Sequence, residues 1–190
     1  NRKTFTFSTW VKRCNLGSNQ AIFTARVGTS SSRDSLRFES NDRLLFDIND
    51  LTQATVRTEA VFRDPSAWYH IVIAVDTTQS TAADRVSIYV NGDEVTDFDA
   101  SSYPSQNLDC NFNSAQPHGI GVHIAAAQQY LDAYLTDVYF IDGQALSASS
   151  FGEFDSNEDW QAITFTGTYG TNGFKLTFSD NSSLANLASD

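Results

Sequence analysis

The sequence predicts an all-β protein, an antiparallel β-sandwich, and three observations lead to this fold class. Residues 69–75 form an almost continuous apolar run rich in Ile and Val, as expected for a strand that is covered on both faces. Residues 86–90 alternate strictly between Val or Ile and Ser or Tyr, which is the period of a strand. The Asn91-Gly92 pair that follows is a strong hairpin signal, because both residues tolerate positive φ in a type I′ turn.

The other strands are predicted, in order, from short apolar or alternating segments separated by Gly, Asn, Asp and Ser. In the first strand, Phe5 and Phe7 point to one face and Trp10 to the other. A single helical turn is expected at 147–151 with Ser147 as its cap, and no segment shows a sustained helical period. Strands are expected at residues 4–12, 21–27, 35–39, 44–48, 56–63, 69–75, 86–90, 94–98, 119–124 and 134–141. Such regular spacing indicates a sandwich.

The stretch after residue 151 has a different pattern. Residues 164–165 and 174–178 are expected to pair across a turn at Asn172-Gly173. The apolar side chains of the second segment share one face, so they either cover an edge of the sandwich or bind a neighbouring subunit. Residues 179–190 have few large apolar side chains and are expected to fray or to lead into a further domain.

Composition and charge limit the possible partners. The chain has 190 residues, within the range of a single β-sandwich domain. Its formal net charge of −11 repels phosphates and anionic lipid heads, so neither nucleic acid nor a membrane is expected as a partner. No apolar run has the length of a membrane span, and no signal-peptide pattern occurs. Since the chain begins at Asn1 and has no Met, we expect it to be a domain of a longer protein.

Several motifs carry a resemblance to a known family. A Trp-Tyr-His sequence leads into the apolar strand at 69–75, and Arg-Val-Ser-Ile-Tyr-Val-Asn-Gly forms the hairpin at 85–92. Further matches are the strand and turn at 134–146, Phe151-Gly152-Glu153, and residues 167–174. Together they resemble laminin-G-like domains of the concanavalin A-like jelly-roll type, especially those in structural and appendage proteins of tailed bacteriophages. The resemblance implies a jelly-roll sandwich over 1–152 and a short C-terminal extension over 153–190.

The same resemblance implies a function. We expect a non-catalytic virion surface domain of a fibre, tail or capsid appendage, which serves assembly contacts or adsorption to a host glycan. Its partners would be a bacterial cell-surface glycan or other virion subunits, and its location would be the virion, outside the cell. The domain would belong to a larger, oligomeric protein, in which weak single-site binding becomes useful through multivalency. A purely structural subunit interface built from residues 169–178 is an alternative.

An enzymatic alternative depends on Glu153, Asp155 and Glu158. Their spacing resembles the E-x-D-x-x-E pattern of concanavalin-like glucanases, in which two carboxylates about 5 Å apart act as nucleophile and acid/base. That chemistry needs a strand that aims the side chains into one cleft, whereas Ser156 and Asn157 here replace the usual apolar strand residues. We therefore expect an acidic loop and a non-catalytic chain, with a glycan hydrolase as the alternative.

Calcium is the one cofactor that the resemblance implies. Laminin-G-like domains often hold Ca²⁺ at one rim through Asp and Asn oxygens, which a hard cation prefers. Asp and Asn are also common in sandwich loops simply because they form turns, and this is the interpretation that we favour. The candidate ligands are Asp47, Asn49 and Asp50 in one loop, Asp84 in another, and Asp132 before the strand at 134–141.

A carbohydrate site needs exposed aromatic rings that stack on sugar faces, with amide groups that bind hydroxyls. Each candidate alone is more typical of ordinary packing or surface residues, but as a set they support a glycan-binding hypothesis. The aromatic candidates are Tyr103, Tyr130, Trp160 and Tyr169, and the amide candidates are Asn107, Gln128 and Gln129.

The cysteines and histidines do not suggest a reactive centre. Cys14 and Cys110 are the only cysteines, and we favour two separate buried thiols over a disulfide, although pairing cannot be deduced from sequence. By the resemblance, His70 is a structural residue of the Trp-Tyr-His motif. The positions of His118 and His123 in the sequence indicate neither a metal cluster nor a catalytic triad.

Overall fold

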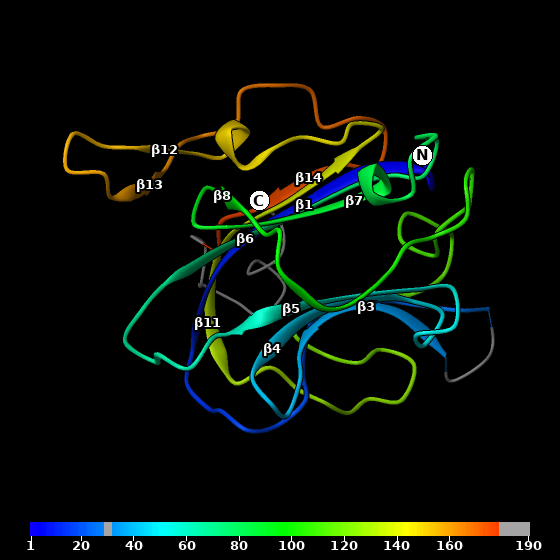
Figure 1. Ribbon diagram of the computed structural model, residues 1–190, viewed down its shortest axis with the longest axis horizontal. Helices are drawn as coiled ribbons and strands as arrows, with labels where there is room; N and C mark the ends of the chain where they lie inside the picture. The colour runs from blue at the N-terminus through cyan, green and yellow to red at the C-terminus, as the bar shows by residue number, and fades with distance from the viewer. Residues whose placement is uncertain (29–31, 179–190) are drawn as a thin grey trace.

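The computed structural model describes residues 1–28 and 32–178, which form two antiparallel sheets packed face to face with a hairpin outside them (Figure 1). This arrangement confirms the predicted all-β sandwich. The expectation of a fraying terminus at 179–190 falls outside the described residues. The strands are β1 (Thr4–Arg13), β2 (Gln20–Arg26), β3 (Arg33–Phe38), β4 (Arg43–Ile48), β5 (Ala54–Val61), β6 (Tyr69–Asp76), β7 (Val86–Val90), β8 (Asp93–Glu94), β9 (Phe98–Ser102), β10 (His118–Ile120), β11 (Ala133–Asp142), β12 (Gly152–Phe154), β13 (Trp160–Ala162) and β14 (Phe174–Leu176), with one-turn 3₁₀ helices η1 (Ala83–Arg85) and η2 (Ala148–Ser150).

One sheet has the strand order β14-β11-β1-β6-β7-β8, and the other has the order β10-β2-β3-β4-β5-β9. The core between them is aromatic. Phe7 of β1 stacks on Phe23 of β2 with ring centroids 4.6 Å apart, and Phe23 stacks on Phe112 at 4.8 Å. The predicted hairpin is confirmed, since Asn91 and Gly92 have φ of 50° and 92° between β7 and β8. Neither short helix in the described chain has the length or apolarity to span a membrane.

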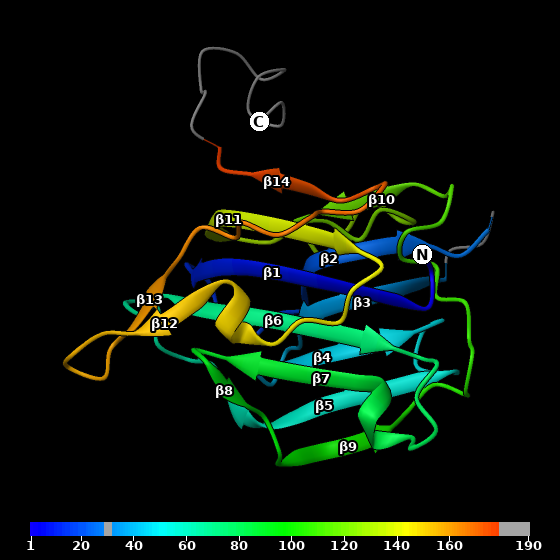
Figure 2. The same ribbon diagram turned by 90° about the horizontal axis from the view of Figure 1, so that it is seen from above.

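The sheet that contains β1 and β6 is covered on its outer face as well. Val72, Tyr139 and Phe151 form a second buried cluster there, with Trp160 and Tyr169 packed against it. The β12–β13 hairpin and the helical turn before it lie over this face (Figure 2). The prediction that 69–75 is a strand buried on both faces is therefore confirmed.

An ion pair is buried at the end of β1. The side chain of Arg13 is fully buried, its Nη2 donates to the Asp42 carboxylate at 3.1 Å, and its guanidinium lies 4.2 Å from the centroid of the Phe38 ring. Arg63 Nε and the Gly17 N–H donate to the same carboxylate at 3.0 and 2.8 Å. Burial raises the pKa of Asp42, but these hydrogen bonds outweigh burial, and the pKa lies below its ordinary value.

The predicted strand at 94–98 is wrong, because the chain changes sheets within it. The Val95 N–H donates to Ile88 O in the first sheet, whereas Asp97 O accepts from the Glu59 N–H in the second. Strand β8 therefore ends at Glu94, and β9 begins at Phe98 against β5. Alternation cannot reveal such a crossover, since both halves have strand character.

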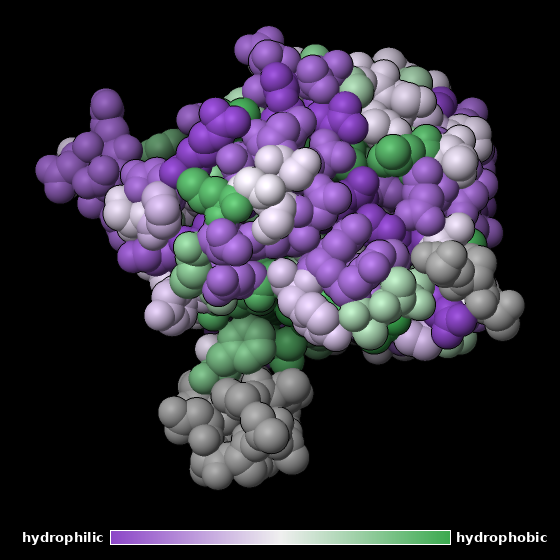
Figure 3. Space-filling model, turned by 90° about the horizontal axis from the view of Figure 1, so that it is seen from below, coloured by the Kyte–Doolittle hydropathy of each residue, from purple (hydrophilic) through white to green (hydrophobic). Residues whose placement is uncertain are grey.

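The predicted pairing of 164–165 with 174–178 is also wrong. Strand β14 pairs with β11 instead, with Leu176 opposite Val138, and so occupies the open edge of the sheet. Its apolar side chains pack against the main core, so they cover an edge of the sandwich, as one of the two alternatives held. Seen from below, apolar surface gathers at this edge, and smaller apolar areas are scattered over a face that is mainly hydrophilic (Figure 3).

The two cysteines are not bonded to each other. Cys110 is buried, and burial raises the pKa of its thiol, so it is a packing residue. Cys14 is exposed, so the expectation that both thiols are buried holds only for Cys110.

Candidate functional site

A groove of about 440 Å³ lies between the β12–β13 hairpin and the end of the first sheet. All three tryptophans of the chain line it, although they come from segments far apart in the sequence. Trp68 is 39% exposed and Phe154 is 51% exposed, so ring surface faces solvent. The lining residues are Trp10, Trp68, Asn91, Asp93, Phe154, Glu158, Asp159, Trp160 and Gln161. We call this site the tryptophan groove.

Strand register brings the aromatic rings together. Trp10 lies on the outer face of β1, directly opposite His70 of β6, and their rings stack with centroids 4.9 Å apart. The Trp160 ring of the hairpin lies beside that of His70, with centroids 5.9 Å apart and planes at 24°, and Phe154 meets Trp160 edge-on at 4.8 Å. The result is a continuous row of rings along one wall of the groove.

Two glycines make room for the indole of Trp160. A Cβ added at Gly152 would lie 2.4 Å from Trp160 Cζ2, and one at Gly92 would lie 2.5 Å from Trp160 Cε3. Any larger residue at either position would push the ring away. Gly92 therefore has two roles: it adopts the positive φ of the β7–β8 turn, and its missing side chain leaves space for the indole of Trp160.

His70 connects the rings by hydrogen bonds. Trp160 Nε1 donates to His70 Nδ1 at 2.9 Å, so the proton of the neutral imidazole lies on Nε2, 2.9 Å from Ser8 Oγ. The Asn91 side chain accepts from the His70 N–H at 2.8 Å. Burial lowers the pKa of His70 to about 4, which keeps the ring neutral and able to accept from Trp160. His70 is thus structural, as the resemblance implied.

We expect an NMR titration to give a His70 pKa close to 4 in place of the ordinary 6.5. Because the folded-state pKa is lowered, the unfolded chain takes up a proton first as the pH falls. This contribution to stability is therefore complete above about pH 6.5 and lost towards pH 4, a change of about 3 kcal/mol. Urea unfolding at several pH values measures it, and in His70→Gln that part of the pH dependence should vanish. A His70 pKa near 6.5 would contradict this assignment.

Carboxylates form the rim at the hairpin turn. Asp155 shapes this turn, because its side chain accepts from the N–H groups of Asn157 and Asp159 at 2.8 and 3.0 Å. Of the three residues in the E-x-D-x-x-E pattern, only Glu158 lines the groove; Glu153 lies on β12, and Asp155 is used by the turn. Glycosidase chemistry needs its carboxylates to point into one cleft, and these three do not.

The predicted glycan-binding residues are spread over the molecule. Of the seven residues predicted to bind a glycan, only Trp160 lines the tryptophan groove. Tyr169 packs outside the first sheet against Phe165, and Tyr103 packs against the main core. The remaining candidates, Asn107, Gln128, Gln129 and Tyr130, lie in loops, where Asn107 makes a turn and Gln129 accepts from Arg33. Six of the seven predicted glycan-binding residues therefore do not line the tryptophan groove.

The candidate calcium ligands do not fit a cation site. Asp47 forms an ion pair with Arg37 and accepts from Ser35, and Asp50 forms an ion pair with Arg33 at 2.9 Å. Arginines already neutralise these oxygens, so a calcium ion would have to compete with fixed positive charge. Within residues 1–28 and 32–178, no three His, Cys, Asp or Glu side chains are placed to share a metal. Asp84 and Asp132 are therefore not grouped with Asp47 and Asp50 in the described part of the chain, and Asn49 donates its backbone N–H to Asp34 at 3.0 Å.

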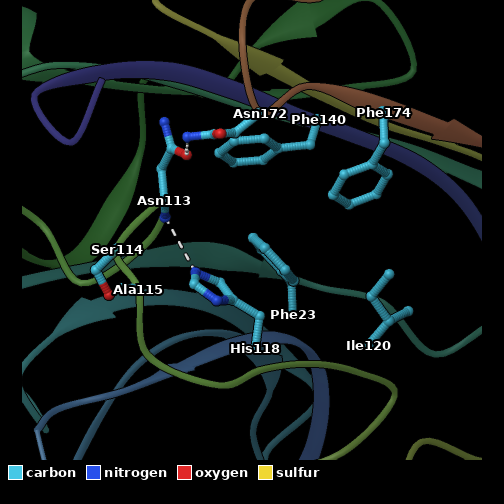
Figure 4. Close-up of a pocket in the computed structure, with 9 residues that line it drawn as sticks. All are labelled: Phe23, Asn113, Ser114, Ala115, His118, Ile120, Phe140, Asn172 and Phe174. Carbon is cyan, nitrogen blue, oxygen red and sulfur yellow. Dashed lines mark hydrogen bonds between the residues drawn. The ribbon is translucent and has the colours of Figure 1, made fainter.

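A second pocket, of about 520 Å³, lies at the edge of the sandwich near β10 and β14 (Figure 4). Its wall is mainly apolar, with the rings of Phe23, Phe140 and Phe174. Its polar groups are bonded within the chain: His118 Nε2 accepts from the Asn113 N–H at 3.0 Å, and the Asn113 side chain bonds Asn172 at 2.8 Å. The pocket suits an apolar group better than a sugar with many hydroxyls.

Sequence reasoning missed most of the groove. Trp10 gave a signal, because alternation places it on the outer face of its strand, opposite Phe5 and Phe7. The other missed residues lie in turns, or in strands too short for a period, and only the folded hairpin brings them to Trp10. They are Trp68, Asn91, Asp93, Phe154, Asp159 and Gln161.

Solved structures with the same fold include a protein from Bacteroides ovatus whose carbohydrate-binding role is itself a proposal. The TM-score is 0.64 at 16% identity over 94% of this chain and 46% of that one. Trypanosoma rangeli sialidase gives 0.53 at 15% identity over 78% of this chain and 22% of that one. Mouse laminin α1 domains LG4-5 give 0.50 at 12% identity over 93% and 41%. The chain thus spans less than half of each, and identities this low show the fold alone.

A family model gives the assignment that these structures cannot. No match is found among curated proteins. The model described as the concanavalin A-like lectin/glucanases superfamily matches residues 1–152, which is most of the chain, and this confirms the resemblance seen in the sequence at the level of the family. The chain belongs to the concanavalin A-like lectin/glucanase superfamily.

Proposed function

We propose that the chain is a non-catalytic carbohydrate-binding domain and that the tryptophan groove holds the glycan. One observation carries this proposal: every tryptophan of the chain lines a single groove with a polar rim. A protein rarely leaves several large aromatic rings at one exposed place without a binding role. The likeness to the Bacteroides ovatus protein supports the same class of ligand.

The groove provides both kinds of contact that a sugar needs. The exposed faces of Trp68 and Phe154 offer apolar surface for the C–H face of a pyranose ring. The Gln161 amide and the carboxylates on the rim offer partners for hydroxyl groups. The edge pocket between β10 and β14 lacks the second kind, since its polar groups mostly bind one another.

Replacement of Trp68 by alanine is expected to weaken glycan binding about ten-fold or more, because a truncated aromatic anchor loses most of its contact area. A glycan array that includes bacterial surface polysaccharides identifies the ligand, and calorimetry on the best glycan measures the loss. The matched control is Tyr130→Ala, since Tyr130 is 64% exposed and does not line the groove. Loss of binding in Tyr130→Ala with full binding in Trp68→Ala would overturn the proposal.

The array is read in calcium and again in chelator. We expect equal binding, because the candidate ligands Asp47 and Asp50 already form ion pairs with arginines. Binding that requires calcium would contradict this expectation and would indicate a cation site formed by other residues.

A location on a virion stays a prediction from the sequence resemblance. In a fibre, tail or capsid appendage, repeated copies of a shallow groove would gain avidity on a bacterial surface glycan. Immunogold labelling of purified particles with an antibody to this domain tests the location. Labelled particles would agree with the prediction, and unlabelled particles would contradict it.

A further inference from the structure

All the charged side chains that line the tryptophan groove are acidic. Asp93 lies on one side, at the β7–β8 hairpin, and Glu158 and Asp159 lie on the other, at the β12–β13 turn. None of the nine residues that line the groove is Lys or Arg. The whole chain has a formal charge of −11, so its net charge also favours a cationic ligand over an anionic one. A sulfated or uronic-acid glycan would be repelled, and a cation would be attracted.

These carboxylates differ from those of the opposite sheet. There, Arg43 pairs with Glu59 at 2.9 Å, and Arg57 pairs with Asp99 at 3.1 Å. By contrast, the ion pairs among residues 1–28 and 32–178 include none of Asp93, Glu158 and Asp159. The groove is therefore a place where negative charge stands beside aromatic rings without a counter-charge from the described chain.

Indole faces add to this preference. The N–H of Trp160 is used by His70, so Trp160 has no free hydrogen-bond donor for a ligand, and exposed indole surface comes from Trp68, which is 39% exposed. A cation placed over an indole face is attracted by the ring quadrupole, and tryptophan is the strongest such partner. A ligand that is both a sugar and a cation satisfies the rings and the carboxylates together.

We propose that the tryptophan groove selects glycans with free amino groups, that is, hexosamine units with a protonated amine, over their N-acetylated and acidic counterparts. This inference rests on the proposed carbohydrate binding. The ammonium lies between the rim carboxylates and an indole face, and the apolar face of the sugar ring packs on the exposed aromatic side chains. Selectivity comes from charge complementarity and cation–π attraction in the same groove.

The test compares glucosamine and N-acetylglucosamine oligomers of equal length in mildly acidic buffer, where the sugar amine is protonated and His70 is still neutral. Calorimetry is expected to give about ten-fold tighter binding of the glucosamine oligomer, and added salt should reduce the difference. In the double variant Glu158→Gln/Asp159→Asn the two oligomers should bind with nearly equal affinity, because the amides still offer hydrogen-bond partners for hydroxyl groups but carry no charge.

Glu153→Gln is the control for general attraction between opposite charges. Glu153 is exposed on the same hairpin but does not line the groove, so its neutralisation should leave the preference unchanged. An equal loss in Glu153→Gln, or an N-acetylated oligomer bound as tightly as the amine form, would overturn the selectivity and leave carbohydrate binding standing. If no neutral, cationic or anionic glycan binds, the proposed function itself fails.

Discussion

Replacement of Asp42 by alanine is expected to lower the free energy of unfolding by about 3–5 kcal/mol, the range for breaking a buried ion pair. The Arg13 side chain is fully buried, and Asp42 is the one carboxylate within 3.1 Å of its guanidinium among the described residues. Without Asp42 a charged group would remain buried beside the Phe38 ring with no counter-ion. Urea unfolding followed by fluorescence measures this change.

The double variant Asp42→Ala/Arg13→Met is the control. Removal of both partners leaves no orphan charge, and methionine fills much of the same space, so its loss should be clearly smaller than that of Asp42→Ala. Arg63 also binds Asp42, but its side chain is 59% exposed and water can replace that contact. If the double variant were as unstable as Asp42→Ala, the buried charge would not be the cause of the instability.

Replacement of Gly152 by alanine is expected to displace Trp160 and weaken glycan binding about ten-fold or more. The added methyl group would lie 2.4 Å from the indole and 2.8 Å from Gln161 O, closer than atoms can pack. The ring must move, and its hydrogen bond to His70 must lengthen or break. We also expect a loss of about 1–3 kcal/mol in stability, as for other overpacked sites.

Calorimetry with the best glycan and urea unfolding measure the two effects of Gly152→Ala. Addition of Trp160→Leu relieves the clash, so the stability losses of the two changes should not add. Glycan binding should stay weak in the double variant, because leucine offers no ring face. Wild-type glycan affinity in Gly152→Ala would show that binding does not depend on the position of the Trp160 ring.

The sandwich could be predicted because its strands have clear local signals. Strand β7 alternates, β6 is a continuous apolar run, and Asn91-Gly92 forms the turn that its φ preferences require. The crossover at residues 95–97 and the pairing of β14 with β11 could not be predicted, because they depend on which sheet edge is open in the folded chain. Alternation gives the face of a residue and not its partner strand.

The site was harder to predict than the fold. Trp160 stood out as an aromatic residue in polar surroundings, but the segments that complete its groove are contributed by β1, the loop before β6 and the β7–β8 hairpin. Tyr103 and Tyr169 also have polar neighbours in the sequence, yet they pack on the two apolar clusters. Local composition cannot separate a packed ring from a binding ring, because tertiary contacts decide which face stays open.

The most direct test of the tryptophan groove is an NMR titration of the three indole N–H signals with a glycan. All three tryptophans of the chain lie in the groove, so these signals report on that site alone. Glycan binding in the groove predicts that the Trp68 and Trp160 signals shift together and saturate, in wild type and in Tyr130→Ala alike. If a glycan binds and shifts backbone signals elsewhere while the indole signals stay in place, the groove is not the site.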